Sequence, residues 1–164
     1  MTTVVSLGSN LGDREGHLRA GLDLLAARFA LLSLSPVYES APVGVTDQPA
    51  FLNCVAVLDT DDAEAVLVAA HDAEDMRGRL RGRRWGPRTL DVDVVAVDRR
   101  VSADPRLTLP HPRVHERAFV LVPWFDADPE AELVGHGLVR DLVRRTDIDA
   151  VRRVDRRGVR RGGG

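Results

Sequence analysis

The sequence of 164 residues lacks lysine, and all 23 of its basic residues are arginine. A chain without lysine has no lysine nucleophile, no Schiff base and no phosphate-binding lysine of the P-loop type. Any polyanion that this chain binds must therefore be held by arginine side chains, metal ions or backbone amides.

Cysteine and aromatic residues are also scarce. Cys54 is the single cysteine, which excludes an internal disulfide and a zinc site built on several thiolates. It lies in the apolar run FLNCVAVLD, so we expect it to be a buried core residue. Aromatic residues make up only 4% of the chain, which disfavours RNA binding by base stacking.

Long apolar runs are missing as well. No run approaches the roughly 20 residues that a membrane-spanning helix needs. The opening MTTVVSLGSN has no basic region before its apolar residues, unlike a signal peptide. We therefore expect a cytoplasmic protein that contacts no membrane.

Composition indicates one ordinary globular domain, with 44% hydrophobic and 29% charged residues. We place this domain at residues 1–150 and predict that the Arg/Gly-rich tail, residues 151–164, is disordered. The net charge is −2, yet residues 152–164 contain six arginines against one aspartate. The body of the chain is therefore distinctly acidic.

Hydrophobic periodicity predicts strands and helices in alternation. Strands are expected at 2–7, 31–40, 51–60 and 90–98, and helices at 14–29 and 61–76, the second opened by Asp61 and Glu64 as a capping pair. A short helix within 107–129 and a last one at 137–145 follow. The order strand, helix, strand, strand, helix, strand predicts an α+β, ferredoxin-like split βαβ fold, an antiparallel sheet with helices packed on it.

The stretch WGPRTLDVDVV, residues 85–95, carries the clearest chemical signal. On a strand, Asp91 and Asp93 point to the same face, about 6–7 Å apart, while Val92 and Val94 point to the other. Two neighbouring carboxylates repel each other unless a cation neutralises them. Oxygen ligands without a His/Cys set suit Mg²⁺, although an isolated pair is also typical of a solvent-facing edge strand.

Arginines are concentrated just before the acid pair. They are Arg77, Arg79, Arg81, Arg83, Arg84 and Arg88. An arginine-rich segment beside a magnesium site fits the binding of a nucleoside triphosphate. By itself such a run is equally typical of a solvated surface or of a nucleic-acid patch.

Two further segments are weaker signals. SLGSNLGD has two glycines before a helix but lacks P-loop spacing, so we interpret it as a tight strand-to-helix turn. His111 and His115 have H-x3-H spacing without a nearby thiol, and His111 between two prolines is better interpreted as a phosphate donor than as a zinc ligand.

Together these motifs resemble the 6-hydroxymethyl-7,8-dihydropterin pyrophosphokinase family of folate biosynthesis. The resemblance covers residues 4–129, through SLGSNLGD, SPVYES with DQPAFLN, RWGPRTLDVDVV and LTLPHPRVHERAFVLVP. It implies a Mg-dependent diphosphokinase that transfers pyrophosphate from ATP to the hydroxymethyl pterin and releases AMP. ATP is then the co-substrate, two Mg²⁺ ions are the cofactors, and a monomer without nucleic-acid partners is expected.

The resemblance also implies residue roles. The catalytic set is Arg79, Arg88, Asp91 and Asp93, of which Asp91 and Asp93 bind the metal. The ATP-binding set is Arg81, Val94, Arg106, Thr108, His111 and Arg117. The pterin-binding set is Ser40, Pro42, Val43, Phe51, Asn53, Trp85 and Phe119, with Phe51 and Phe119 sandwiching the ring. Without the resemblance, Phe51 and Phe119 fit plain core packing.

Two rival functions stay open from sequence alone. The first is a different Mg-dependent nucleotidyl or phosphoryl transferase that uses the same acid pair. The second is a nucleic-acid-binding module, which would show salt-sensitive binding that depends on the tail.

Overall fold

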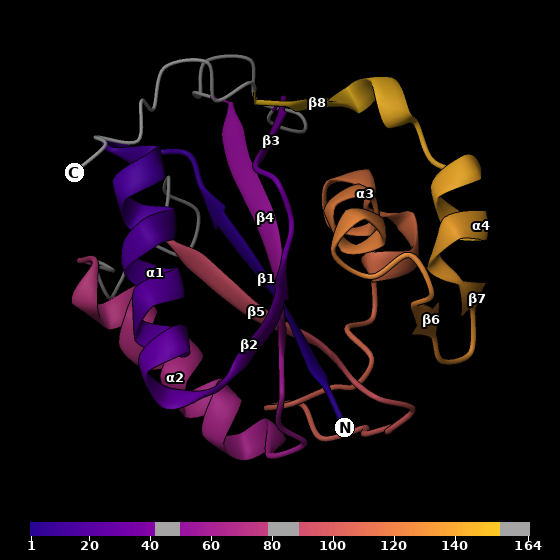
Figure 1. Ribbon diagram of the computed structural model, residues 1–164, viewed down its shortest axis with the longest axis horizontal. Helices are drawn as coiled ribbons and strands as arrows, with labels where there is room; N and C mark the ends of the chain where they lie inside the picture. The colour runs from indigo at the N-terminus through magenta and orange to yellow at the C-terminus, as the bar shows by residue number, and fades with distance from the viewer. Residues whose placement is uncertain (42–49, 79–88, 155–164) are drawn as a thin grey trace.

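An antiparallel sheet forms the centre of the computed structural model, which describes residues 1–41, 50–78 and 89–154 (Figure 1). Its strands are β1 (Thr3–Ser9), β2 (Leu31–Leu34), β3 (Tyr38–Ser40), β4 (Phe51–Leu58), β5 (Asp91–Val97) and β8 (Val151–Arg153). Their spatial order is β5-β1-β4-β3-β8, and β2 also pairs with β4. The long strands β1 and β4 are therefore central.

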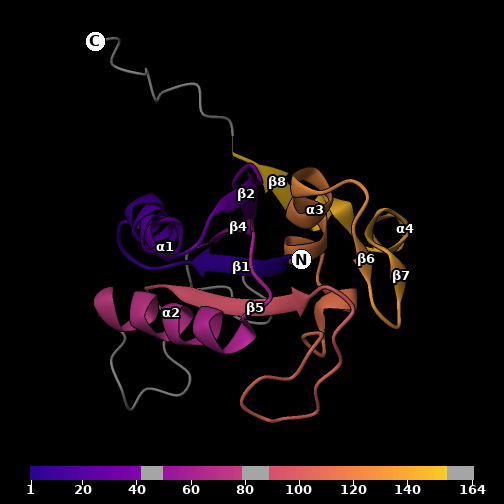
Figure 2. The same cartoon turned by 60° about the horizontal axis from the view of Figure 1, so that its bottom comes forward.

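Helices cover both faces of this sheet (Figures 1 and 2). On one face lie α1 (Arg14–Arg28) and α2 (Ala63–Met76); on the other lies α3 (Ala118–Ala127), against which α4 (Val139–Arg144) packs. Short elements join them: the 3₁₀ turns η1 (Val114–Glu116) and η2 (Ile148–Ala150), and the hairpin of β6 (Glu132–Leu133) and β7 (Gly137–Leu138).

The core is divided in two by the alternation of side chains along the strands. Val5 and Leu7 of β1 belong to the cluster under α1 and α2, whereas Val4 belongs to the cluster under α3. Along β4, Cys54 points to the first cluster and Val55 to the second. Every residue of β1 and every residue of β4 except Phe51 is buried, and the predicted burial of Cys54 is confirmed.

The observed topology confirms the predicted ferredoxin-like α+β fold. The fourth predicted strand, β5, lies beside β1, and the third, β4, lies between β1 and the second, which gives the split βαβ order. The predicted extended segment 31–40 is two strands, β2 and β3, separated by a stretch that contains Pro36. Proline lacks the N–H that a continuous ladder needs.

Three predicted boundaries are wrong. Asp62, not Asp61, caps α2, because its side chain accepts a hydrogen bond from the Ala65 N–H at 3.1 Å. The last helix starts at Val139 instead of 137, since Gly137–Leu138 pairs as β7. Disorder from residue 151 onward is wrong for β8, which pairs with β3 and forms an edge of the sheet. Residues 155–164 of the predicted tail lie outside the described residues.

Within the described ranges, no helix combines the length and apolar character that crossing a membrane requires.

Candidate active site

Part of the sheet face under α3 is polar. Along β1, Val4 is followed on this face by Ser6 and Gly8; along β5, Asp91 and Asp93 precede Val95. Strand register aligns these residues in rows, with Ser6 beside Asp93 and Gly8 beside Asp91. The apolar end of the face is filled by α3, and the polar end is left as the floor of a cavity.

The cavity has a volume of about 700 Å³, within the range of small-molecule sites. The strands β1, β3, β4 and β5 supply its floor, and η1 with the start of α3 supplies one wall. Its lining residues are Ser6, Gly8, Ser40, Ala41, Phe51, Asn53, Asp91, Asp93, Arg113, Glu116, Arg117, Ala118, Phe119, Asp147, Ala150 and Val151.

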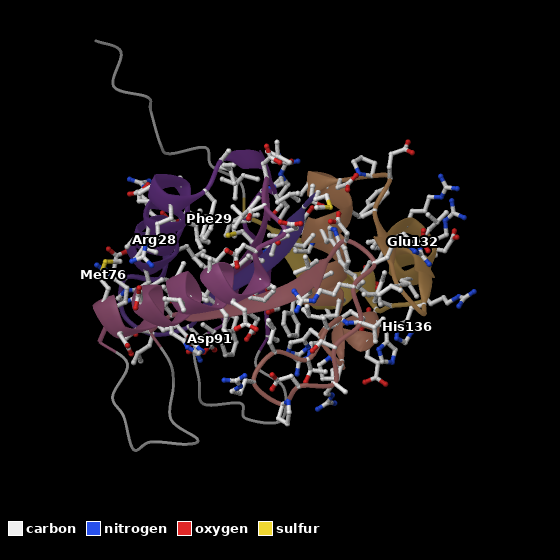
Figure 3. The ribbon with its side chains drawn as sticks, turned by 90° about the horizontal axis from the view of Figure 1, so that it is seen from below. Arg28, Phe29, Met76, Asp91, Glu132 and His136 are labelled. Atoms are coloured by element: carbon white, nitrogen blue, oxygen red, sulfur yellow. The ribbon has the colours of Figure 1, made fainter. Side chains whose placement is uncertain are left out.

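The acid pair lies at the start of β5, where Asp91 is labelled in Figure 3. Asp91 is half-buried and Asp93 is exposed, and both line the cavity. Val92 and Val94 point into the opposite core, as the alternation predicts. The predicted shared face of the two carboxylates is therefore confirmed.

This donor set fits magnesium. Among the described residues, no cluster of three or more His, Cys, Asp or Glu side chains is arranged to hold a metal. Two carboxylates facing an open cavity suit a cation that takes its other ligands from water and substrate phosphate, as Mg²⁺ does.

The η1 wall of the cavity carries charge of both signs, since Glu116 lines it too and lies 3.9 Å from Arg113 Nε. Arg113 and Arg117 both line the cavity, and the Arg117 guanidinium carbon lies 5.7 Å from the centroid of the Phe119 ring. This cation–π contact orients the guanidinium group without neutralising it. The cavity therefore combines carboxylates on its floor with arginines on the η1 wall, which suits a metal-bound polyphosphate.

His111 lies next to this charged region but does not line the cavity. Its backbone N–H donates to the Val95 carbonyl at 2.8 Å, which ties it to β5. Burial lowers the pKa of the imidazole; Asp93 raises it and Arg117 lowers it further. His111 is therefore within electrostatic reach of one predicted metal ligand and one predicted ATP contact.

Asn53 and its neighbours form the uncharged part of the floor. The Asn53 amide nitrogen donates to the Ser40 hydroxyl at 2.9 Å, and the Asn53 side chain is buried. Gly8 lies beside it on β1, where a Cβ would come within 2.9 Å of Asn53 Oδ1. Glycine at position 8 thus leaves room for the orientation that Asn53 adopts.

The predicted site residues are only partly brought together. The cavity gathers Ser40, Phe51, Asn53, Asp91, Asp93, Arg117 and Phe119. Val94 instead packs in the core under α1 and α2. Arg106 is exposed and pairs with Asp104 at 3.2 Å, and the Thr108 hydroxyl donates to the Asp104 carbonyl at 3.0 Å.

The contacts predicted for Val94, Arg106 and Thr108 stay predictions. Six other predicted residues lie outside the described ranges: Pro42, Val43, Arg79, Arg81, Trp85 and Arg88.

Several lining residues were missed from sequence. Ser6 and Gly8 lie in the strand before SLGSNLGD turns, and the two-residue period that paired Asp91 with Asp93 would have placed them on one face. Asp147 and Val151 had no such signal, because they reach the cavity only through the pairing of β8 with β3.

Comparisons with known proteins agree on one family. The family model described as 7,8-dihydro-6-hydroxymethylpterin-pyrophosphokinase (HPPK) matches residues 4–129. A Mycobacterium tuberculosis protein named 2-amino-4-hydroxy-6-hydroxymethyldihydropteridine pyrophosphokinase is 44% identical over 156 residues, covering 88% of this chain and 82% of its own. A Pseudomonas aeruginosa protein of the same name is 38% identical over 153 residues, covering 92% and 94%.

Solved structures agree on the fold. A Plasmodium falciparum HPPK-DHPS triple mutant with SDX-DHP matches with a TM-score of 0.70 at 16% identity, over 93% of this chain. A second HPPK-DHPS structure, in complex with substrates, matches with a TM-score of 0.66 at 10% identity. This chain spans about half the length of these solved chains, 47% and 48%.

Proposed function

Because this chain belongs to the 7,8-dihydro-6-hydroxymethylpterin-pyrophosphokinase family, we propose that it transfers pyrophosphate from ATP to 6-hydroxymethyl-7,8-dihydropterin in folate biosynthesis. One observation carries the proposal: a single cavity is lined by the acid pair of β5 and by Asn53, Phe51 and Phe119. Such a cavity has room for a metal-bound triphosphate beside a flat heteroaromatic ring.

The distance between the acid pair and Asn53 suits a transfer between a bound triphosphate and a bound pterin. Asp91 and Asn53 flank Gly8 in one row of the sheet. They are therefore two strand spacings apart, or about 10 Å. In the proposed reaction the pterin hydroxyl oxygen attacks the β-phosphorus and its proton is released to solvent. The bond between the β-phosphorus and the oxygen bridging it to the α-phosphorus breaks, and AMP leaves.

For the pterin, we assign the ring faces to Phe51 and Phe119 and the polar edge to Asn53. Aromatic stacking adds about 0.5–1.5 kcal/mol per pair beyond burial. An unmet polar group on a buried ring edge costs about 1–3 kcal/mol, which Asn53 would avoid. Ser40 supports this role because its hydroxyl fixes the Asn53 amide; Pro42, Val43 and Trp85 complete the proposed pterin set.

For the metal, we propose that Asp91 and Asp93 hold two Mg²⁺ ions. Bound there, magnesium supplies charge neutralisation to the phosphates. The two carboxylates would hold the magnesium charge at the floor of the cavity, which Arg113 and Arg117 also line.

For ATP, we propose contacts from Arg81, Val94, Arg106, Thr108, His111 and Arg117, with Arg79 and Arg88 stabilising the transferring group. The electrostatic influence of both Asp93 and Arg117 on His111, and the place of Arg117 in the cavity lining, support this assignment for His111 and Arg117. Each arginine fork would bind two phosphate oxygens, and in this lysine-free chain arginine is the side chain that supplies permanent positive charge.

Product analysis tests the proposal. The protein is mixed with ATP, MgCl₂ and 6-hydroxymethyl-7,8-dihydropterin, and nucleotides are separated by chromatography. We expect AMP and the pterin diphosphate in equal amounts, and no turnover after EDTA removes the metal. ADP as the product would instead indicate a different phosphoryl transferase.

We also propose that the enzyme acts as a monomer in the cytoplasm. Light scattering at micromolar concentrations measures the first point, and cell fractionation measures the second. A mass of two chains, or recovery with the membranes, would contradict the respective statement.

A further inference from the structure

Three side-chain hydrogen bonds join α1, the end of α2 and the approach to β5. Arg77 Nε donates to His17 Nδ1 at 2.8 Å. The Thr89 hydroxyl donates to the Arg77 carbonyl at 2.7 Å, and the Ser9 hydroxyl donates to the Thr89 carbonyl at 2.5 Å. We call this chain of four residues the His17 clasp.

Ser9 and Arg77 lie at the ends of elements, Thr89 lies just before one, and His17 lies near the start of α1. Ser9 is the last residue of β1, Arg77 is the C-cap of α2, and Thr89 lies two residues before Asp91, where β5 begins. Helix ends and strand ends fray when nothing holds them. The clasp therefore fixes the backbone at the point where the chain enters β5.

The start of β5 is also held by its ladder with β1 and by core packing. Asp91 pairs with Gly8, the first pair of the β1–β5 register, and Leu90 packs in the core under α1. Because Thr89 both donates and accepts a hydrogen bond, it cannot move without breaking two contacts. Thr89 thus holds the backbone two residues before Asp91, which lines the cavity.

His17 can hold Arg77 only while its imidazole is neutral. Nδ1 accepts from Arg77, so the proton lies on Nε2. Burial, and then the Arg77 charge, lower the His17 pKa, whereas Asp13 and a hydrogen bond with the Leu11 backbone raise it. The net shift favours the neutral form that the clasp requires.

We infer that His17 is a positioning residue for the proposed reaction, acting through Arg77 and Thr89 on the placement of Asp91. The inference depends on the proposed function for its kinetic consequence. Its structural part, the anchoring of the start of β5, stands independently. His17 touches no cavity-lining residue in this role and is not a catalytic residue.

Substitution of His17 tests the inference. His17→Ala removes the acceptor, and His17→Asn keeps an acceptor oxygen near the position of Nδ1. We expect His17→Ala to lower kcat about tenfold, the factor expected for a lost hydrogen bond of a charged donor, with KM for the pterin within twofold. His17→Asn should recover most of that loss. His71→Ala, at an exposed position of α2, is the matched control and should be unchanged.

Thr89→Val breaks the clasp at a second point without altering His17. It should reproduce the kinetic change, whereas Thr89→Ser, which keeps the hydroxyl, should not. In the double variant His17→Ala/Thr89→Val, the loss should be close to that of one single variant, because both act through the same anchor. Full additivity would show that the two residues act separately and would overturn the inference.

Hydrogen exchange gives a readout that does not depend on activity. In His17→Ala, the backbone amides of residues 90–92 should exchange about tenfold faster, while those of Val57 and Leu58 at the opposite end of the sheet keep their wild-type rates. Exchange that is unchanged at residues 90–92, or raised equally across β4, would refute the inference. If the wild-type protein makes no AMP, the proposed function fails, and the exchange data still decide on the clasp.

Discussion

The two faces of the central sheet are built from the same strands, yet they differ in what they leave open. Under α1 and α2, the strands present an unbroken apolar surface that includes Leu7, Cys54 and Val92. Under α3, each long strand packs in the core at one end and lines the cavity at the other. In β1 these ends are Val4 and Gly8, and in β4 they are Val57 and Asn53. One face is a closed core, and the other is half core and half cavity.

The difference follows from helix coverage. Two helices of 15 and 14 residues cover the first face, whereas α3, with 10 residues, is the helix that packs against the second. Polar side chains at the uncovered end avoid the cost of burial without partners. Substitutions on the first face should therefore change stability, and those at the open end of the second should change catalysis.

The largest effect is expected for Asp93→Asn, which removes one charge from the open end. Losing a preorganised electrostatic group typically costs about 100- to 1,000-fold in kcat. Stability should be unchanged or slightly higher, because one of two repelling carboxylates is gone. Steady-state kinetics and thermal unfolding measure the two quantities.

Asp98→Asn is the matched control for that substitution, since Asp98 follows the other end of β5 and bonds to the Thr2 N–H at 2.9 Å. It should leave kcat within twofold of wild type. Substantial Mg-dependent turnover in Asp93→Asn would contradict the metal role.

Leu25→Ala tests the closed face. Leu25 of α1 is 1% exposed, and truncation of a buried leucine costs about 2–5 kcal/mol of unfolding free energy. Urea unfolding measures this loss, and kcat at a temperature where the variant stays folded should match wild type. Leu32→Ala, at a position 55% exposed, should change the unfolding free energy little. A lower kcat in folded Leu25→Ala would contradict the expectation that substitutions on the first face change stability alone.

A pair of glycines compares the faces directly. In Gly8→Ala, the new methyl group would displace Asn53 Oδ1 and disturb its bond to Ser40. Loss of one such contact, about 1–3 kcal/mol, predicts a rise of roughly tenfold in KM for the pterin.

Gly21→Ala places a methyl group 3.0 Å from a Leu7 methyl in the closed core. Overpacking costs about 1–3 kcal/mol, and the better helix propensity of alanine returns about 1 kcal/mol. We expect a small loss of stability and an unchanged KM. If Gly8→Ala left KM unchanged while Gly21→Ala raised it, the assignment of the pterin site to the α3 face would be wrong.

The smallest effect is expected for Tyr38→Phe, which removes a hydrogen bond between β3 and α3. The Tyr38 hydroxyl donates to the Asp126 carboxylate, and removal should cost about 1 kcal/mol. Burial, followed by this bond and the Asp126 charge, raises the pKa of Tyr38 to about 12. The protonated hydroxyl is thus favoured by folding, so its contribution is complete below pH 10 and is lost as pH rises through 12.

Urea unfolding of the wild type and Tyr38→Phe at pH 7 and pH 9 measures what the Tyr38 hydroxyl contributes to the free energy of unfolding. The difference between the two proteins should be the same at both values. A difference that had already vanished at pH 9 would show that the hydroxyl ionises much earlier than its environment indicates.

Sequence alone determined the type and approximate place of the main strands and helices and the shared face of the two carboxylates. The pattern of apolar residues identifies a strand in 51–60 and a helix in 61–76. Burial on one or both faces of an element dictates where apolar residues recur. The spacing of Asp91 and Asp93 places both carboxylates on one face, since strand geometry is local. Boundaries were less accurate, as at Asp62, where capping by either of two adjacent aspartates was possible.

Only the tertiary structure decided what surrounds those carboxylates. Whether Asn53, Phe119 and Asp147 share a cavity with Asp93 depends on strand order, on the reach of α3 and on the pairing of β8. The same holds for the bond between His17 and Arg77, which are 60 positions apart. Local patterns fix the direction of each side chain, whereas contacts between distant segments depend on how whole elements pack, which no single stretch of sequence encodes.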